Sequence, residues 1–357
     1  MHIPNRQLGL TIVELMVALL LSLLLVGGVL QIYIGTKSTY RVTEGLSRLQ
    51  ENTRFSTEML ARDIRMAGYI PCSQPQNKLS LVNSSKWWSA LFENSIKGFE
   101  NGANPFPGET NEVLAGSDSI IILRGGNKVA AVNFYDAAND QIIMQRDLGG
   151  ADWVEPGSLM IACDSTTARL FQAGAIQSSD PTRISIADGT GTESPGNTTA
   201  NLGHSFSNDS QLANYFAVAY YITDSSPGSG SEYSLYRRYL NVNSSMQNSA
   251  PSEELIENVE TMQLLYGLDL NNDGLADKYL KADNSELASN WQDVVTVRVG
   301  LLFASEDGLR EAAGFDEKPY VVANTVIDVE GTPGVPTHAR DKRKRYVSSM
   351  TVSVRNI

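Results

Sequence analysis

An apolar run near the amino terminus restricts the fold more than any other feature of the sequence. In QLGLTIVELMVALLLSLLLVGGVL, residues 7–30, Glu14 is the only charged side chain, and no charge lies between Leu15 and Thr36. As a helix, the stretch from Leu15 to Thr36 is about 33 Å long. The hydrocarbon core of a bilayer is about 30 Å thick, so the run predicts one membrane-spanning helix.

A cleaved secretory signal peptide is the alternative interpretation of this run. The run is longer than the apolar part of an ordinary signal peptide, and no clear A-x-A cleavage site follows it. Only Arg6 and the amino terminus supply positive charge ahead of it, which suits a short cytoplasmic leader. Under either interpretation, we expect the chain beyond Thr36 to lie outside the cytoplasm.

The helix is expected to continue past the membrane as an amphipathic segment. Hydrophobic residues recur there at helical spacings, at Leu46, Leu49, Phe55, Met59, Leu60 and Ile64. Gly68 and then Pro71 end the pattern. We therefore predict a leader at 1–9, a membrane-spanning helix half at 10–36 and an amphipathic helix half at 37–68.

From residue 69 to 357 the sequence changes to short apolar runs separated by polar loops. Strand-like runs lie at 117–126, 157–163, 214–223, 232–242, 293–305 and 345–357. The runs 214–223 and 232–242 flank a stretch rich in Ser and Gly, residues 224–231, which predicts a β-hairpin with a long polar turn. Residues 252–269 begin with helical spacing and then alternate as a strand. The sequence therefore predicts an α+β protein in which a long amino-terminal helix packs on a strand-rich, antiparallel β head.

Composition argues against two classes of function. The formal net charge is −12, and phosphate binding requires clustered Lys and Arg, so we expect no nucleic-acid partner. The basic run RDKRKR at 340–345 is short, and we interpret it as a solvated turn or a docking surface for an acidic subunit. The three histidines are far apart, and there is no GxSxG, P-loop or HExxH motif. We therefore expect no enzymatic activity.

The two cysteines, Cys72 and Cys163, allow a single intramolecular disulfide. A disulfide suits the oxidising compartment that the membrane helix predicts for the rest of the chain. The alternative is a pair of buried free thiols.

The stretch DLNNDGLAD resembles the start of a calcium loop, D-x-[DN]-x-[DN]-G. The candidate ligands are Asp269, Asn271, Asp273, Leu275 through its carbonyl, and Asp277. Position 12 of the loop is Leu280, where the full motif has a bidentate Glu, so the site is incomplete by that standard. Calcium is thus the one cofactor that the sequence suggests, and an Asx-Gly hairpin turn is the alternative.

The motif GLTIVEL at residues 9–15 resembles the class III signal of type IV pilins and of type II secretion pseudopilins. In that family a prepilin peptidase cuts after the glycine, and the new amino terminus is often N-methylated. The resemblance implies a cut between Gly9 and Leu10, which makes Glu14 the fifth residue of the mature chain. Leu10 stands where the family more often has phenylalanine.

A carboxylate near the bilayer interior costs about 2.5–3.5 kcal/mol, so Glu14 requires compensation. Cleavage frees the α-amine of Leu10, and Glu14 lies roughly 6 Å further along the helix. A neighbouring subunit shifted by that rise brings its own amine to this carboxylate. We therefore expect Glu14 to set the register of assembly; the alternative is a snorkelling or protonated side chain without a partner.

Five further stretches resemble minor pilins of the PilW type, and together they lie in the helix and the head: RDIRMAGYIPC, GSLMIACDSTTARLF, SEELIENVETMQLLYGLDLNNDGLADKY, VVTVRVGLLFAS and YVSSMTVSVRN. The resemblance implies a subunit that initiates type IV pilus assembly near the fibre tip. It implies the other minor pilins, the major pilin and prepilin peptidase as partners. It also implies an inner-membrane protein with a periplasmic head, which then enters the surface fibre and serves twitching motility.

Two other functions are compatible with the sequence. A minor pseudopilin of a type II secretion system has the same helix and signal. A membrane-tethered, calcium-binding adhesin requires the helix only as an anchor. Such a tether tolerates substitution of Glu14, whereas a pilin does not.

Overall fold

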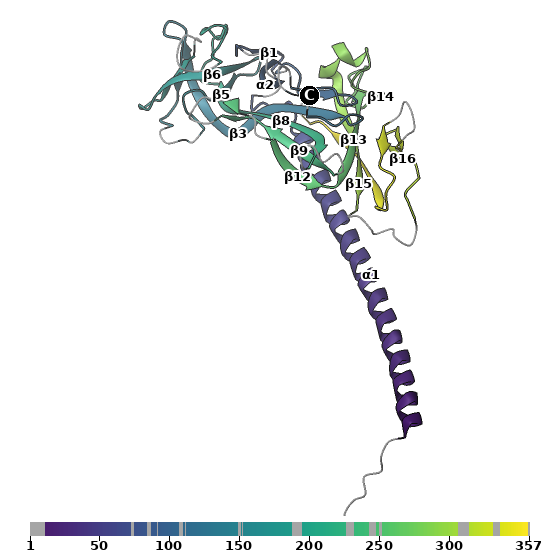
Figure 1. The fold of residues 1–357 in the computed structure, drawn as a ribbon. Coiled ribbons are helices and arrows are strands. Elements are labelled where there is room, and N and C mark those ends of the chain that lie inside the picture. Colours follow the sequence, from purple (N-terminus) through teal and green to yellow (C-terminus); the bar gives the residue numbers. More distant parts are fainter. Residues whose placement is uncertain are drawn as a thin grey trace, which may run out of the picture. The chain divides into compact units, whose positions relative to one another are not determined.

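The computed structural model describes most of the chain. The described residues are 11–72, 75–83, 87–90, 92–106, 110, 112–148, 151, 153–187, 195–225, 232–242, 248–249, 252–305, 314–330 and 336–355. The chain divides into two compact units, Met1–Gln50 and Glu51–Ile357. The helix α1 (Ile12–Arg65) has 54 residues and contributes to both units (Figure 1).

The helix is uninterrupted because no proline lies within its span. It ends at Arg65, and a turn follows in which Gly68 has a φ of 70°, the left-handed conformation that terminates helices and favours glycine. The N–H of Gly68 donates to the carbonyl of Leu123 at 2.9 Å, which fixes the helix end to the head. In the first unit, the side chains from Thr11 to Tyr40 are exposed in the isolated chain.

The second unit contains a ten-stranded sheet with the order β12-β9-β8-β5-β6-β7-β4-β3-β2, in which β1 pairs with β6. Its strands are β1 (Asn77–Ser80), β2 (Ile96–Phe99), β3 (Ser119–Asp136), β4 (Gln141–Met144), β5 (Leu159–Cys163), β6 (Thr167–Gln177), β7 (Arg183–Ile186), β8 (Gln211–Asp224), β9 (Tyr233–Tyr239) and β12 (Ser252–Glu257). Only the β1–β6 pair is parallel.

An additional pairing between β3 and β8 closes part of this sheet into a ring through β5, β6, β7 and β4. Alternate residues of these strands, such as Val132, Met144, Phe171 and Leu212, belong to one buried apolar cluster. Because alternate residues of a strand share a face, the ring is filled by side chains, as in small barrels.

The opposite faces of β8 pack against different parts of the unit. Tyr221 belongs to a cluster with Trp87 and Trp88 of the short helix α2 (Trp87–Ala90). The neighbouring Tyr220 reaches the other face, where its hydroxyl donates to Asp63 of α1. The sheet therefore lies between the end of α1 and the segment that contains α2.

Two smaller sheets follow in the chain, and the first of them is antiparallel. The sheet β14-β13-β15-β19 consists of β13 (Val259–Leu268), β14 (Lys278–Leu280), β15 (Val294–Ala304) and β19 (Arg345–Ser353). The sheet β16-β17-β18 consists of β16 (Tyr320–Val322), β17 (Thr325–Val329) and β18 (Thr337–His338). In this second sheet β16 and β17 are antiparallel, and β17 and β18 pair in parallel. The remaining elements are the ladder of β10 (Asn241–Val242) with β11 (Asn248–Ser249) and two 3₁₀ turns, η1 (Leu287–Ser289) and η2 (Trp291–Asp293).

Residues 116–118 join the two larger sheets. The N–H of Asp118 donates to the carbonyl of Met262 at 2.8 Å, and a carboxylate oxygen of Asp118 accepts from the N–H of Leu264 at the same distance. The hydroxyl of Ser117 accepts from the N–H of Met262 at 3.0 Å. The start of β3 therefore covers part of the edge of β13.

The structure confirms the α+β class, with one long helix and a strand-rich antiparallel head. It also confirms the pairing of the runs 214–223 and 232–242, as β8 and β9. The helical start expected at residue 252 is wrong, because residues 252–257 form β12 and pair with β9. The strands β1, β2, β4, β6, β7, β16, β17 and β18 were not expected. The antiparallel pair of β13 and β14 matches the hairpin that was the alternative to a calcium loop.

Candidate functional site

The amino-terminal processing residues, Gly9 and Leu10, lie outside the described residues. The first described residue is Thr11, which forms a capping box with Glu14. A carboxylate oxygen of Glu14 accepts from the N–H and from the hydroxyl of Thr11, and the Thr11 hydroxyl oxygen accepts from the N–H of Glu14, each at 3.3 Å. The sequence carries this signal as Thr11-x-x-Glu14, a capping-box pattern that was not among the predictions.

Among the described residues, α1 is the helix that is long and apolar enough to cross a bilayer. Its most apolar 18-residue window has a mean hydropathy of 2.6. The large apolar side chains from Ile12 to Ile34 are 53–80% exposed in the isolated chain. A helix that is apolar on all sides requires lipid or other helices around it.

Hydroxyl side chains along α1 are satisfied within the helix. Ser22, Thr36 and Thr39 each donate to the carbonyl four residues earlier, at 2.7–3.0 Å. An unsatisfied hydroxyl costs free energy in an apolar medium, so these internal bonds reduce the cost of surrounding the helix with lipid.

A buried polar cluster anchors the last turns of α1 to the sheet. Asp63 is only 1% exposed, and its carboxylate accepts from the Tyr220 hydroxyl at 2.7 Å. Arg124 of β3 lies 4.0 Å from the other carboxylate oxygen. Burial, and then the charge of Asp63, raise the pKa of Tyr220 far above its ordinary value. The hydroxyl therefore stays protonated and donates to a carboxylate.

The expected disulfide is present between Cys72 and Cys163, whose Cα atoms are 5.8 Å apart. Cys72 follows the end of α1 by a few residues, and Cys163 is the last residue of β5. The bond therefore ties the helix exit to a strand inside the ten-stranded sheet.

The candidate calcium loop is a compact turn that binds its own backbone. The carboxylate of Asp269 accepts from the N–H groups of Asn271, Asp273 and Gly274, at 2.7–3.2 Å. Asp277 accepts from the N–H of Leu270 at 2.7 Å. Burial opposes ionisation of Asp269, but the backbone donors outweigh it and lower its pKa.

The other polar side chains of this loop also form hydrogen bonds within it. Asp273 accepts from the N–H of Leu275 at 2.8 Å, and the amide of Asn271 donates to Asp277 at 3.3 Å. No cluster of three or more His, Cys, Asp and Glu side chains within the described ranges has a metal-binding arrangement. Calcium binding by Asp269, Asn271, Asp273, Leu275 and Asp277 stays a prediction.

The basic run at 340–345 is not a solvated turn throughout, because two of its arginines are buried. Arg345 has no exposed side-chain surface; its guanidinium donates to Glu260 at 2.6 and 2.8 Å and contacts Asp316 at 3.2 Å. Arg343 donates to Glu260 at 3.1 Å and to Asp341 at 2.8 Å. Burial opposes ionisation of Asp341, but hydrogen bonds from Arg345 and Arg343 lower its pKa to about 2.

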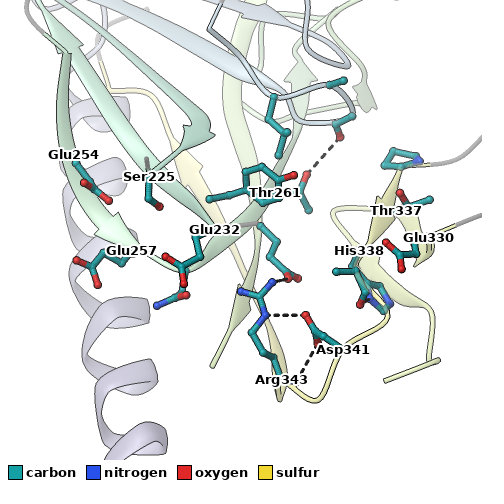
Figure 2. A pocket seen from close by; sticks show the side chains of 18 residues that line it. Ser225, Glu232, Glu254, Glu257, Thr261, Glu330, Thr337, His338, Asp341 and Arg343 are labelled. Atoms are coloured by element: carbon teal, nitrogen blue, oxygen red, sulfur yellow. Dashed lines mark hydrogen bonds and ion pairs between the residues drawn. The ribbon is translucent and has the colours of Figure 1, made fainter. Parts of the chain in front are cut away.

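Three members of this cluster, Glu260, Asp341 and Arg343, form the floor of a groove in the head, which has a volume of about 860 Å³ (Figure 2). One wall carries Glu232, Glu254 and Glu257, and the facing wall carries Glu330 and His338. Among the described residues, the lining contains six carboxylates and a single guanidinium, that of Arg343. The groove was not expected from the sequence, because its lining comes from segments far apart in the chain, from Leu114 to Arg343.

Two family models match the chain, in different regions. The prokaryotic N-terminal methylation motif matches residues 4–30, which include Gly9, Leu10 and Glu14. Residues 219–356 match the type IV pilus-assembly protein W family. No curated protein and no solved structure matches the chain.

The PilW match extends from within β8 to the end of β19. It includes the ion-pair cluster, the loop at Asp269 and nearly all of the groove lining. It also includes three of the stretches in which we saw the resemblance, at 252–279, 294–305 and 346–356. The stretches at 62–72 and 157–171, which contain Asp63 and the disulfide, lie outside both matched regions.

Proposed function

We propose that the chain is a minor pilin that initiates assembly of a type IV pilus and occupies a position near the fibre tip. The coincidence of a prepilin motif at one end and a PilW match at the other carries this proposal. A pseudopilin shares only the first of these features. The role is structural: the helix joins the fibre core, and the head contacts the other subunits.

The route of the protein follows from the same two features. Prepilin peptidase cuts between Gly9 and Leu10, and the new amino terminus is methylated. Residues 10–36 span the inner membrane, residues 37–68 form the stalk, and residues 69–357 form a periplasmic head. The disulfide between Cys72 and Cys163 supports an oxidising compartment for that head. Other minor pilins and the major pilin are the partners.

Glu14→Gln is the substitution that tests this function most sharply. Glutamine retains a capping box with Thr11, as a glutamate does, but removes the charge. If Glu14 pairs with the amine of a neighbouring subunit, the variant is inserted and cut normally but is not recovered with the other pilins. The measurements are the mass of the mature amino terminus, co-purification of pilins from the membrane and the number of surface fibres.

Glu14→Asp and Thr11→Ser serve as controls, since each keeps the groups that the cap and the charge require. A wild-type number of fibres with Glu14→Gln would contradict a charge role in assembly and favour a simple tether. If deletion of the gene abolishes protein secretion but leaves twitching motility intact, the chain belongs to a secretion system instead.

A further inference from the structure

The groove in the head has a surplus of negative charge that the fold does not neutralise. Arg343 and Arg345 neutralise Glu260 and Asp341 on the groove floor. Glu254, Glu257 and Glu330 are exposed, and no ion pair between described residues involves any of them. Carboxylates gathered along a concave surface focus the negative potential there and attract cations.

The groove also lies at the end of a sheet. Glu254 and Glu257 belong to β12, the terminal strand of the ten-stranded sheet, which pairs with β9 on its other side. A terminal strand presents backbone donors and acceptors to which an extended segment can add. A volume of about 860 Å³ is far larger than a single hydrated ion requires.

From these observations we infer that the groove between β12 and β18 binds an extended segment, rich in Lys and Arg, of a different pilin subunit. This inference rests on the proposed role in pilus assembly, and it names the surface of the head through which that role is exerted. A second copy of this head is a poor occupant, because residues 69–357 contain 35 acidic against 21 basic residues and repel their like.

The floor and the walls of the groove have different roles in this inference. The buried pairs of Glu260 with Arg343 and Arg345 fix the floor, and Arg343, the one Lys or Arg among the described lining residues, is itself buried. The exposed glutamates on both walls attract the basic side chains of the incoming segment (Figure 2). Neutralising the wall glutamates is therefore expected to weaken binding of the partner segment without changing the ion pairs of the floor.

The first test is a pair of double variants in the full-length chain. Glu254→Gln with Glu257→Gln removes two charges from the groove, and Glu93→Gln with Asp283→Asn removes two exposed charges elsewhere on the head. Both pairs change the net charge equally. We expect the groove variant to lose at least fivefold in recovery of the other pilins from membranes, and the control variant to match wild type.

The second test identifies the occupant directly. A photo-crosslinking residue, p-benzoylphenylalanine, replaces Glu257 in one strain and Glu93 in another, and the cross-linked peptides are sequenced. We expect the groove position to capture one Lys- or Arg-containing peptide of another pilin, with no equivalent product from the control position. An acidic or uncharged peptide, a peptide from a second copy, or no product above the control would overturn the inference.

The outcomes separate this inference from the proposed function. Fibres that require the chain but form normally with the groove variant would overturn the groove and leave the pilin role intact. Normal fibres in a deletion strain would overturn the pilin role itself. A third outcome is that the purified chain binds spermidine, that the groove variant does not, and that no cross-linked peptide is found. The inference would then be overturned, and the ligand of the groove would be a small cation and not a polypeptide.

Discussion

Asp63 lies on α1 between Arg62, whose side chain is 69% exposed, and Ile64, which is fully buried. Helical periodicity alone places Asp63 on the buried face, since it follows the buried Leu60 by three positions. A charged side chain at such a position is nevertheless expected at the surface, because Asp is almost never fully buried unless it is paired. The partners, Tyr220 and Arg124, come from distant strands, and no local pattern identifies them. The same holds for Arg343 and Arg345, whose burial depends on Glu260, more than 80 positions away in the sequence.

The contact between Asp63 and Tyr220 predicts a measurable loss of stability. Tyr220→Phe removes the hydroxyl and leaves a buried carboxylate short of a donor, so we expect a loss of about 1.5–3 kcal/mol in the free energy of unfolding. Urea unfolding of the full chain in detergent measures it. Tyr346→Phe is the matched control. Because Tyr346 is 50% exposed, we expect this variant to keep the wild-type free energy of unfolding within experimental error. Equal stability of the two variants would show that the buried hydrogen bond contributes nothing.

At the scale of elements, residues 252–257 illustrate where sequence patterns fail. Leu255, Ile256 and Val259 have helical spacing, and the neighbouring glutamates favour helices. Pairing with β9 determines the structure instead, through Arg237 opposite Glu253 and Leu235 opposite Ile256. The loop that starts at Asp269 shows the reverse case, because its Asx and Gly residues predicted a turn from local chemistry alone.

The joint between the two larger sheets should make stability depend on pH. Burial, and then the nearby Glu100, raise the pKa of Asp118 to about 7, although hydrogen bonds from Asn101 and Leu264 and the charge of Lys281 oppose this. The folded state thus keeps a proton that the unfolded state has lost above pH 4. We expect the free energy of unfolding to fall by about 2–3 kcal/mol between pH 5 and pH 8.

Comparison with Asp118→Asn isolates this contribution. The variant is less stable at every pH, because one backbone donor then faces an amide N–H₂. It should nevertheless lose less stability than wild type as the pH rises, because it has no carboxyl group to titrate. Identical pH profiles for the two proteins would assign the dependence to groups other than Asp118.

The loop at Asp269 carries the calcium prediction. If the loop binds calcium in the folded state, millimolar calcium raises the melting temperature of the full chain by mass action. Asp269→Ala with Asp273→Ala abolishes the shift, whereas magnesium at the same concentration produces little of it. Without a shift in wild type, the loop is a turn, held by the hydrogen bonds that Asp269 accepts from its own backbone.

At the scale of the whole molecule, the sequence predicted the long helix, the strand-rich head and the amino-terminal signal, because each depends on a periodic or local pattern. It did not predict the ring closed by β3 and β8, the joint at residues 116–118 or the groove. These depend on pairings between segments far apart in the chain, such as Ile120 with Tyr220. The groove in particular forms where the ends of three sheets meet, and only that arrangement brings its carboxylates together.

The disulfide is the whole-molecule feature whose removal is simplest to interpret. It closes a loop of 91 positions, so the loop-entropy model predicts a loss of about 4–5 kcal/mol when Cys72 and Cys163 are both replaced by Ser. Unfolding of wild type with and without dithiothreitol measures the same quantity. The double variant is its own control, since it has no cysteine left and should not respond to the reductant. A wild-type protein indifferent to reduction would refute the prediction.

The same bond also decides how the head responds to tension. A pull on α1 is resisted first by the contacts of Asp63 and Gly68 with the sheet. Once these contacts break, the load reaches Cys72 and passes directly to Cys163 in β5, between β6 and β8. The load does not pass through residues 73–162, because the disulfide connects the two ends of this segment. About 300 Å of chain, its fully extended length, therefore cannot be pulled out. A subunit pulled by its helix therefore extends little until several strands separate together. It transmits the load with little change in length.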